Sequence, residues 1–293
     1  MNRFFTLFLG AALLFAPACN RPEDTFDGKN GVKVVYFKGT HELKARIAYK
    51  NGYADGLYES YYPGGKVKSK GYYREGARHG SFTHYYENGQ VKQTEFFTED
   101  KPDSTFRLYS KAGKVTVEKN YKGGKLDGRS AEYFPDGKPR IGQHYVQGQL
   151  DGEQKTYYSS GKLKEVAFYR KGFPGAGAKE YAADGTLEAP SASILVEEVN
   201  QLALESKYVY RFRLSRTTPY DKLFLTDKLR EGRYTHPSMY PLPKKGAYFE
   251  HVFFVPKGGS LMQSIVVVAQ TRTASGKDLV LTKELNVGLT NFY

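Results

Sequence analysis

A period of 24 residues runs through the middle of this 293-residue chain without a gap. Six units follow one another from Ile47 to Pro190, and three columns hold in all of them: an aromatic residue at position 3, tyrosine at position 15 and glycine at position 19. The columns are Tyr49, Tyr73, Phe97, Tyr121, Tyr145 and Tyr169; Tyr61, Tyr85, Tyr109, Tyr133, Tyr157 and Tyr181; and Gly65, Gly89, Gly113, Gly137, Gly161 and Gly185. Because so short a unit cannot bury its own apolar surface, each unit must pack on its neighbours.

Each unit contains two short aromatic segments with turn residues between them. In the first unit, residues 57–62 and 66–73 are predicted strands that flank a Pro-Gly-Gly turn. Later units carry Asn-Gly or Asp-Gly at this turn, pairs that favour a type I′ hairpin because both central residues need positive φ. We therefore predict an all-β fold in which residues 31–190 form an elongated antiparallel meander of 24-residue β-hairpin repeats.

Glycine and aspartate columns mark a second turn, which leads from one unit into the next. Glycines recur at positions 6 and 10, whereas the third unit has Asp100 and Ser104 there. The pairs are Gly52 and Gly56, Gly76 and Gly80, Gly124 and Gly128, and Gly148 and Gly152. Aspartate at position 9 is expected to cap its own turn through a bond from side chain to backbone. These aspartates are Asp55, Asp103, Asp127 and Asp151.

The amino-acid sequence of the units resembles that of a known repeat. The stretches YYPGGKVKSKGYYREGARHG and YFPDGKPRIGQHYVQGQLDG are similar to the bacterial variant of the MORN repeat, the one found in the YwqK-type antitoxin family. The resemblance covers residues 36–190. It implies an elongated twisted sheet used for protein contact or, in eukaryotic relatives, for membrane lipids, and it brings no catalytic residue. One function that it implies is that of an antitoxin or immunity protein that neutralises a partner toxin.

Residues 1–18 have the layout of a signal peptide. Arg3 precedes an apolar stretch over residues 4–15, which is too short to span a bilayer as a helix. The following Ala-Pro-Ala-Cys resembles the lipobox of bacterial lipoproteins, although Ala16 stands where leucine is usual. We expect lipidation of Cys19, a tether over residues 19–30, and a lipid-anchored protein of the bacterial cell envelope at the outer membrane, periplasmic or surface-exposed. The alternative is an ordinary signal peptide that contains a cysteine.

The last hundred residues, 191–293, lose the 24-residue period. Alternation of polar and apolar side chains is clearest over residues 208–214. Six or seven short strands with Gly-rich turns between them are predicted here. That number of strands in about 100 residues is typical of an immunoglobulin-like β-sandwich, although the usual Trp and disulfide are absent.

The formal net charge of +13 includes a ladder of basic residues at positions 20 and 22 of the units. The ladder consists of Lys66, Lys68, Lys92, Lys114, Lys138, Arg140, Lys162 and Lys164, and we expect Tyr61, Tyr85, Tyr133 and Tyr157 to flank it. It is either a solvated face that prevents edge aggregation or a binding track for an anionic envelope polymer, lipid head groups or an acidic protein. Lysine with tyrosine also suits nucleic acid, which an exported protein rarely meets.

No motif of catalysis or metal binding stands out. Gly123–Ser130 has the glycine spacing of a phosphate loop, but Arg129 replaces its lysine and a strand follows instead of a helix. His79 and His84 have no third metal ligand near them in the sequence. The single cysteine excludes an intramolecular disulfide. We therefore expect a non-enzymatic protein without cofactor or metal, whose repeats bind a protein or an envelope ligand.

Overall fold

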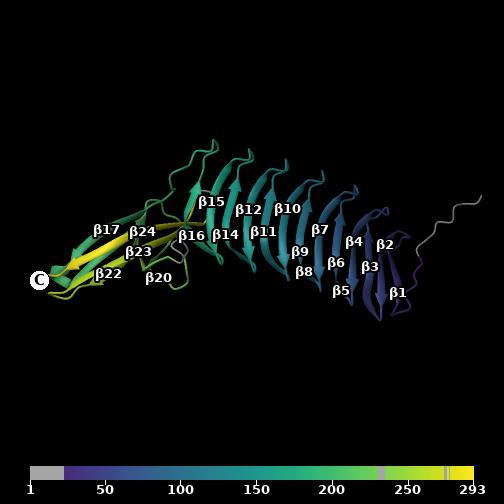
Figure 1. Ribbon diagram of the computed structural model, residues 1–293, viewed down its shortest axis with the longest axis horizontal. Helices are drawn as coiled ribbons and strands as arrows, with labels where there is room; N and C mark the ends of the chain where they lie inside the picture. The colour runs from purple at the N-terminus through teal and green to yellow at the C-terminus, as the bar shows by residue number, and fades with distance from the viewer. Residues whose placement is uncertain (1–22, 230–234, 274–275, 277) are drawn as a thin grey trace, which may run out of the picture.

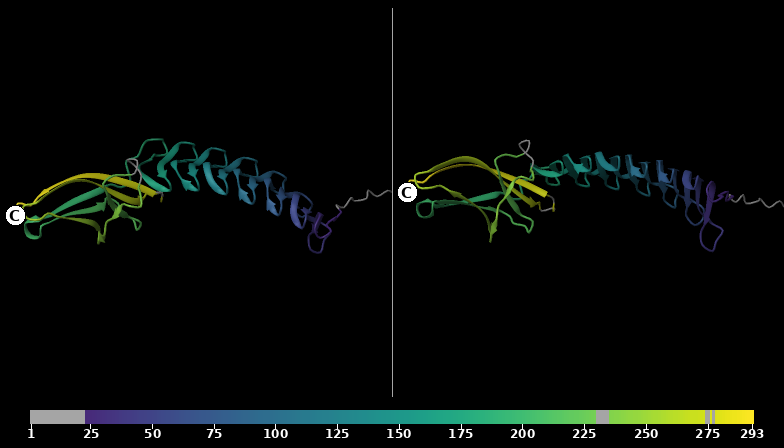
Figure 2. Two further views of the ribbon diagram at one scale, coloured as in Figure 1. Left: turned by 60° about the horizontal axis from the view of Figure 1, so that its bottom comes forward. Right: turned by 90° about the horizontal axis from the view of Figure 1, so that it is seen from below.

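A computed structural model describes residues 23–229, 235–273, 276 and 278–293. The predicted signal peptide and Cys19 lie outside these residues. The described chain is elongated: a long sheet built from the repeats occupies one end, and a smaller β-rich part occupies the other (Figures 1 and 2).

The repeats form one continuous antiparallel sheet of 16 strands in a single layer. The longer strands follow one another in chain order from β1 to β16, and the two-residue strands β5, β8 and β13 pair with β4, β7 and β12, so the predicted meander of hairpins is confirmed. Its strands are β1 Gly31–Tyr36, β2 Leu43–Lys50, β3 Tyr53–Tyr61, β4 Val67–Arg74, β5 Ala77–Arg78, β6 Gly80–Tyr85, β7 Val91–Thr98, β8 Lys101–Pro102, β9 Ser104–Tyr109, β10 Val115–Lys122, β11 Lys125–Tyr133, β12 Pro139–Val146, β13 Gln149–Leu150, β14 Gly152–Tyr157, β15 Leu163–Arg170 and β16 Phe173–Glu180.

Two kinds of turn connect the strands, one kind at each long edge of the sheet, and we call them the upper and lower turns after their place in Figure 1. The upper turns, at residues 62–66 and their equivalents every 24 residues, differ from the predicted type I′. Of their central residues, Asn88 and Asp136 do not have positive φ, whereas the glycine at position 19 does in every unit. A three-residue loop that ends on a glycine with positive φ, followed by a shift of strand register, is a hairpin with a G1 bulge.

The lower turns, at the edge where β5 and β8 lie in Figure 1, are the two-residue hairpins. In the first of them, Asn51 and Gly52 have φ of 53° and 86°. Positive φ at both central residues is the type I′ geometry that the sequence predicted for the other edge. The third unit keeps this backbone without the glycine pair, since Asp100 and Ser104 have φ of 62° and 90°.

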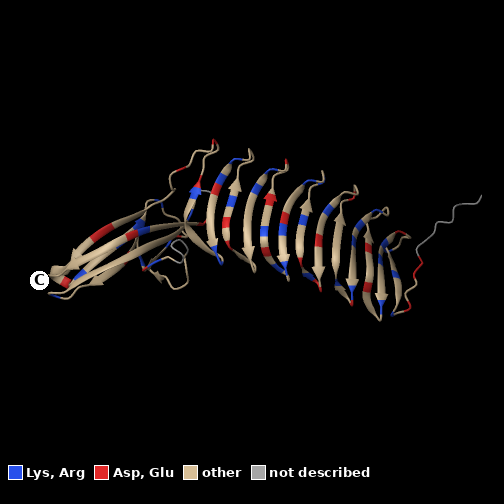
Figure 3. Ribbon diagram, in the orientation of Figure 1, with Lys and Arg blue, Asp and Glu red and all other residues tan. Residues whose placement is uncertain are grey.

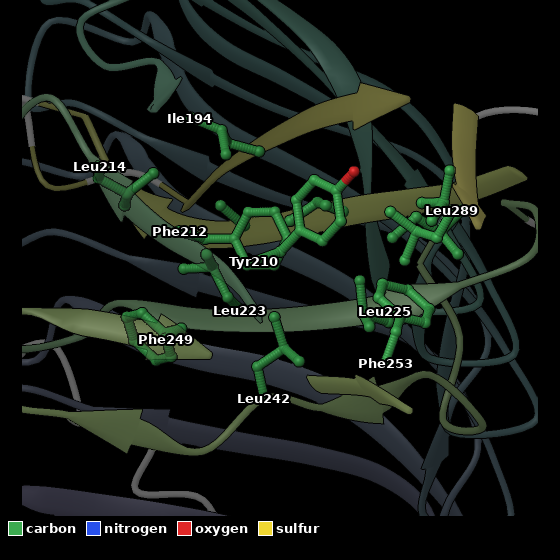
Figure 4. Close-up of a cluster of buried hydrophobic side chains, with 14 of the residues drawn as sticks. Ile194, Tyr210, Phe212, Leu214, Leu223, Leu225, Leu242, Phe249, Phe253 and Leu289 are labelled. Atoms are coloured by element: carbon green, nitrogen blue, oxygen red, sulfur yellow. The ribbon is translucent and has the colours of Figure 1, made fainter. Parts of the chain in front are cut away.

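The C-terminal part contains two four-stranded antiparallel sheets with orders β17-β18-β22-β21 and β20-β19-β23-β24. A buried cluster lies between them, with Phe212 and Val267 at 0% exposure (Figure 4). Its elements are β17 Ile194–Gln201, α1 Leu202–Glu205, β18 Lys207–Leu214, β19 Lys222–Thr226, β20 Tyr240–Pro241, β21 Lys244–Lys245, β22 Tyr248–Phe254, β23 Ser260–Arg272 and β24 Asp278–Thr290. Two sheets around one core agree with the predicted strand-rich unit, and its likeness to an immunoglobulin-like sandwich stays a prediction.

The last hairpin of the repeat sheet packs directly against the C-terminal part. A second buried cluster joins Ala176 of β16 to Val266, Val268 and Val280 of β23 and β24. Thr235, which is fully buried, donates from its backbone N and its Oγ1 to the carbonyl of Pro174 at 3.1 and 2.9 Å. The two parts of the molecule therefore share buried surface.

Candidate functional site

In the repeat sheet, four of the six aromatic residues of position 3 lie opposite a glycine of position 10 on the adjacent strand, and Tyr121 lies opposite Ser104 instead. Tyr73 lies opposite Gly56, and Phe97 lies opposite Gly80. Gly71 leaves room for the ring of Phe82, since a Cβ there would lie 2.4 Å from it. Phe82 contacts Tyr73 and Phe97 edge to face at centroid distances of 5.6 and 5.5 Å. These ring contacts hold adjacent strands of the sheet together, and the same strands carry the basic ladder.

The predicted basic ladder lies along the edge of the upper turns, and we call its eight residues the lysine edge. The lysines of position 20 belong to the turns, and the basic residues of position 22 lie at or next to the start of the following strand. In the ribbon of Figure 3, basic residues recur from strand to strand along the sheet, with acidic residues between them.

Three of the four position 20 lysines reach from one upper turn to the next. The Nζ of Lys114 donates to the carbonyl of Asp136 at 3.2 Å, and that of Lys162 donates to the carbonyl of Asp184 at 2.7 Å. Lys138 lies 3.4 Å from the carbonyl of Ser159 and also pairs with the Asp136 carboxylate at 3.3 Å. A backbone carbonyl holds an ammonium group in place without neutralising its charge.

The position 22 lysines lie over tyrosine rings. The Nζ atoms of Lys68 and Lys92 are 5.7 and 5.8 Å from the ring centroids of Tyr62 and Tyr86, and Lys164 repeats this contact over Tyr158 at 5.6 Å. Arg140 instead forms an ion pair with Glu132. The rings that carry the lysines therefore belong to position 16, one residue after the tyrosines that the sequence analysis placed beside the ladder.

The tyrosines of position 15 are half-buried. The hydroxyl of Tyr61 donates to Glu59 at 3.0 Å, and burial, followed by this carboxylate, raises the pKa of Tyr61. Tyr85, Tyr133 and Tyr157 occupy the equivalent positions at the ends of β6, β11 and β14.

The position 16 hydroxyls join neighbouring units. Tyr62 donates to the carbonyl of Tyr85 at 2.9 Å, and Tyr86 donates to that of Tyr109 at 2.7 Å. Tyr158 repeats the bond to the carbonyl of Tyr181 at 2.8 Å. The same tyrosine thus supports a lysine with its ring and binds the next unit with its hydroxyl.

Part of the repeat region matches a known repeat family. Three segments match the MORN repeat variant. They are residues 54–75, 78–99 and 150–171. No curated protein matches the chain. The hairpins between the second and third MORN segments have the same turns and strand pairing, although their sequence departs further from the pattern at Asp100 and Ser104.

The position 9 aspartates of the repeat units accept hydrogen bonds from the neighbouring lower turn. Asp55 accepts from the backbone N of Glu75 at 3.1 Å, and Asp127 accepts from that of Gln147 at 3.2 Å. Asp103 and Asp151 repeat the bond at 3.3 and 3.2 Å. The prediction that each aspartate caps its own turn was therefore wrong: each caps the turn of the next unit, because adjacent lower turns lie side by side in the sheet.

The sheet also brings together a serine, a histidine and a glutamate that the sequence analysis missed. Ser69 Oγ lies 2.8 Å from His84 Nδ1, and His84 Nε2 lies 3.2 Å from Glu95 Oε1. They come from β4, β6 and β7, and only the strand register reveals their contact. Ser69 is 6% exposed in the middle of a strand that is paired on both sides, so these three side chains join three strands.

The described residues contain neither a cluster of metal-binding side chains nor a membrane-spanning helix. No three side chains of His, Cys, Asp or Glu among them gather closely enough to hold a metal ion. No helix in that part of the chain has the length and apolar character to cross a membrane.

Proposed function

We propose that this protein is a non-catalytic binding scaffold of the bacterial cell envelope, whose lysine edge contacts an anionic ligand. The observation that carries the proposal is the way in which the lysines are held. Backbone carbonyls and tyrosine rings position Lys68, Lys92, Lys114 and Lys162 while their positive charge stays uncompensated by these contacts. Side chains that are already ordered lose less entropy when they bind, which favours affinity.

The spacing of the lysine edge suits an extended ligand. Equivalent side chains of successive hairpins lie about 10 Å apart, because each unit adds two strands of about 4.8 Å. This distance is close to the Debye length at physiological salt, so the charges act mainly on a ligand in direct contact with several of them. An anionic envelope polymer or an acidic protein surface has charges repeated over this length.

Attachment to the envelope is the second part of the proposal. It rests on the apolar segment of residues 4–15 and on Cys19 in a lipobox-like setting. Wild-type protein is expected in the membrane fraction of cells and the Cys19→Ala variant in the soluble fraction, with protease treatment of intact cells reporting which side the repeats face. If both proteins are cytosolic, the envelope location is wrong.

Binding by the lysine edge is tested with a heparin column as the anionic probe. A variant with Lys66, Lys92, Lys114 and Lys138 replaced by Gln is compared with a control variant in which Lys50, Lys101, Lys122 and Lys125 are replaced by Gln. The control removes the same number of charges from exposed lysines at the lower turns. Both variants therefore have the same net charge.

The lysine-edge variant is expected to elute at distinctly lower salt than the wild type, and the control variant at a salt concentration much closer to the wild type. Equal shifts for the two variants would mean that retention follows net charge alone. Unchanged retention of the lysine-edge variant would exclude the lysine edge as the binding site.

A further inference from the structure

Five large apolar side chains are exposed at the end of the molecule farthest from β1 (Figure 1). They come from α1, the end of β22, the start of β23 and the residues after β24. We call this group the apolar tip: Leu204, exposed to 91%, Phe254 to 68%, Met262 to 86%, Phe292 to 84% and Tyr293 to 66%. Exposed large apolar side chains at one end of a molecule can mark an interaction site.

The backbone beneath the apolar tip is firmly held. Asn291, which is 1% exposed, donates from Nδ2 to the carbonyl of Val255 at 2.9 Å and to Ser206 Oγ at 3.3 Å. Its backbone carbonyl accepts from Gly258 at 2.7 Å, and its backbone N donates to Gly259 at 2.9 Å. Hydrogen bonds of Asn291 thus join the segment after β24 to the ends of α1 and β22, and these segments carry the exposed apolar residues.

The charged side chains around the apolar tip are few: two lysines and one glutamate. Lys207 lies 5.9 Å from the ring centroid of Phe254 and pairs with Glu205 at 2.7 Å. Lys257 lies in the loop after β22 and is exposed. No other Asp, Glu, Lys or Arg occurs in residues 202–207, 253–262 and 288–293, all of which the structure describes.

We propose that the apolar tip inserts into the interface of a lipid bilayer that contains anionic lipids. Leucine, methionine and aromatic side chains on protruding segments suit the boundary between head groups and acyl chains, where tyrosine can keep its hydroxyl hydrated. Lys207 and Lys257 lie where they would meet anionic head groups, and the whole chain, at +13, is attracted to the same surface. This site is independent of the lysine edge and of lipidation at Cys19.

A fluorescent label at the apolar tip tests the proposal. The full chain with Cys19→Ala and Leu204→Cys is labelled with an environment-sensitive dye and mixed with vesicles of phosphatidylcholine, with or without phosphatidylglycerol. A matched chain carries the dye at Tyr53→Cys, a 62% exposed site near the other end of the molecule. This control reports any binding to vesicles through the N-terminal segment.

A blue shift at residue 204 that needs phosphatidylglycerol, is quenched by spin-labelled lipid and is absent at residue 53 is the expected result. No shift at residue 204, or equal shifts at both sites, would overturn the proposal. A shift that grows with protein concentration in the absence of vesicles would also overturn it, since the apolar tip would then bind a second copy of the chain.

A second experiment measures vesicle-induced insertion after loss of two aromatic side chains. The double variant Phe254→Ser with Phe292→Ser is expected to lower the apparent affinity for vesicles at least about tenfold. This affinity is read from the lipid concentration that gives half of the shift at residue 204. The control is Leu187→Ser with Tyr240→Ser, two exposed residues outside the apolar tip. An equal effect of the two double variants would contradict insertion of the tip.

Discussion

Individual tyrosine hydroxyls join one repeat unit to the next, and their contribution to stability can be measured one residue at a time. Tyr86→Phe removes the 2.7 Å bond to the carbonyl of Tyr109 but keeps the ring under Lys92. We expect a loss of about 1 kcal/mol in the free energy of unfolding, measured by urea denaturation. Tyr72→Phe, at a 51% exposed ring, serves as the control and should change it little; equal losses would contradict the role given to Tyr86.

His251 links the stability of the C-terminal part to pH. Burial lowers the pKa of His251, so the unfolded chain binds a proton at a higher pH than the folded chain does. The folded state therefore loses stability as pH falls below about 6.5, the ordinary value of histidine. His251→Gln removes the proton uptake by this side chain on unfolding. The unfolding free energy should therefore fall less between about pH 7.5 and about pH 5 in the variant than in the wild type. An identical fall in both proteins would refute this assignment.

At the scale of one hairpin, two strand glycines make a matched pair for testing the packing of the aromatic rows. A Cβ at Gly71 would lie 2.4 Å from the ring of Phe82, whereas a Cβ at Gly142 would meet no heavy atom within 4 Å. Gly71→Ala should cost about 1 to 3 kcal/mol through overpacking. Gly142→Ala should be neutral or stabilise by up to about 1 kcal/mol. Chemical denaturation of the two variants compares these outcomes directly, and a similar effect at both sites would show that Phe82 can move aside.

The hairpins also show what a sequence period can and cannot predict. The columns of tyrosine and glycine predicted hairpins and their order, because those residue types mark strands and turns. They did not predict which edge carries the type I′ turns, since Glu75, Gln147 and Lys171 adopt positive φ there without being typical of that conformation. The contact among Ser69, His84 and Glu95 was equally hidden, because it depends on register across three strands.

For the molecule as a whole, the sequence predicted the distribution of charge better than its local contacts. The eight residues of the lysine edge could be named from the period alone. Their partners could not, because Lys114 and Lys162 reach the following unit's turn, a contact that depends on how successive hairpins stack. The apolar tip was also missed, since its members are separated in sequence and converge only where Asn291 ties their segments together.

The most direct test of the account is a map of where an anionic ligand protects the full-length protein. Amide hydrogen exchange is measured with and without heparin oligosaccharide, and the upper turns are compared with the lower turns of the same repeat sheet. Binding along the lysine edge predicts slower exchange at residues 62–66, 110–114, 134–138 and 158–162 and little change at the lower turns. Protection confined to the lower turns, or to the C-terminal part, would contradict the proposal that the lysine edge is the binding surface.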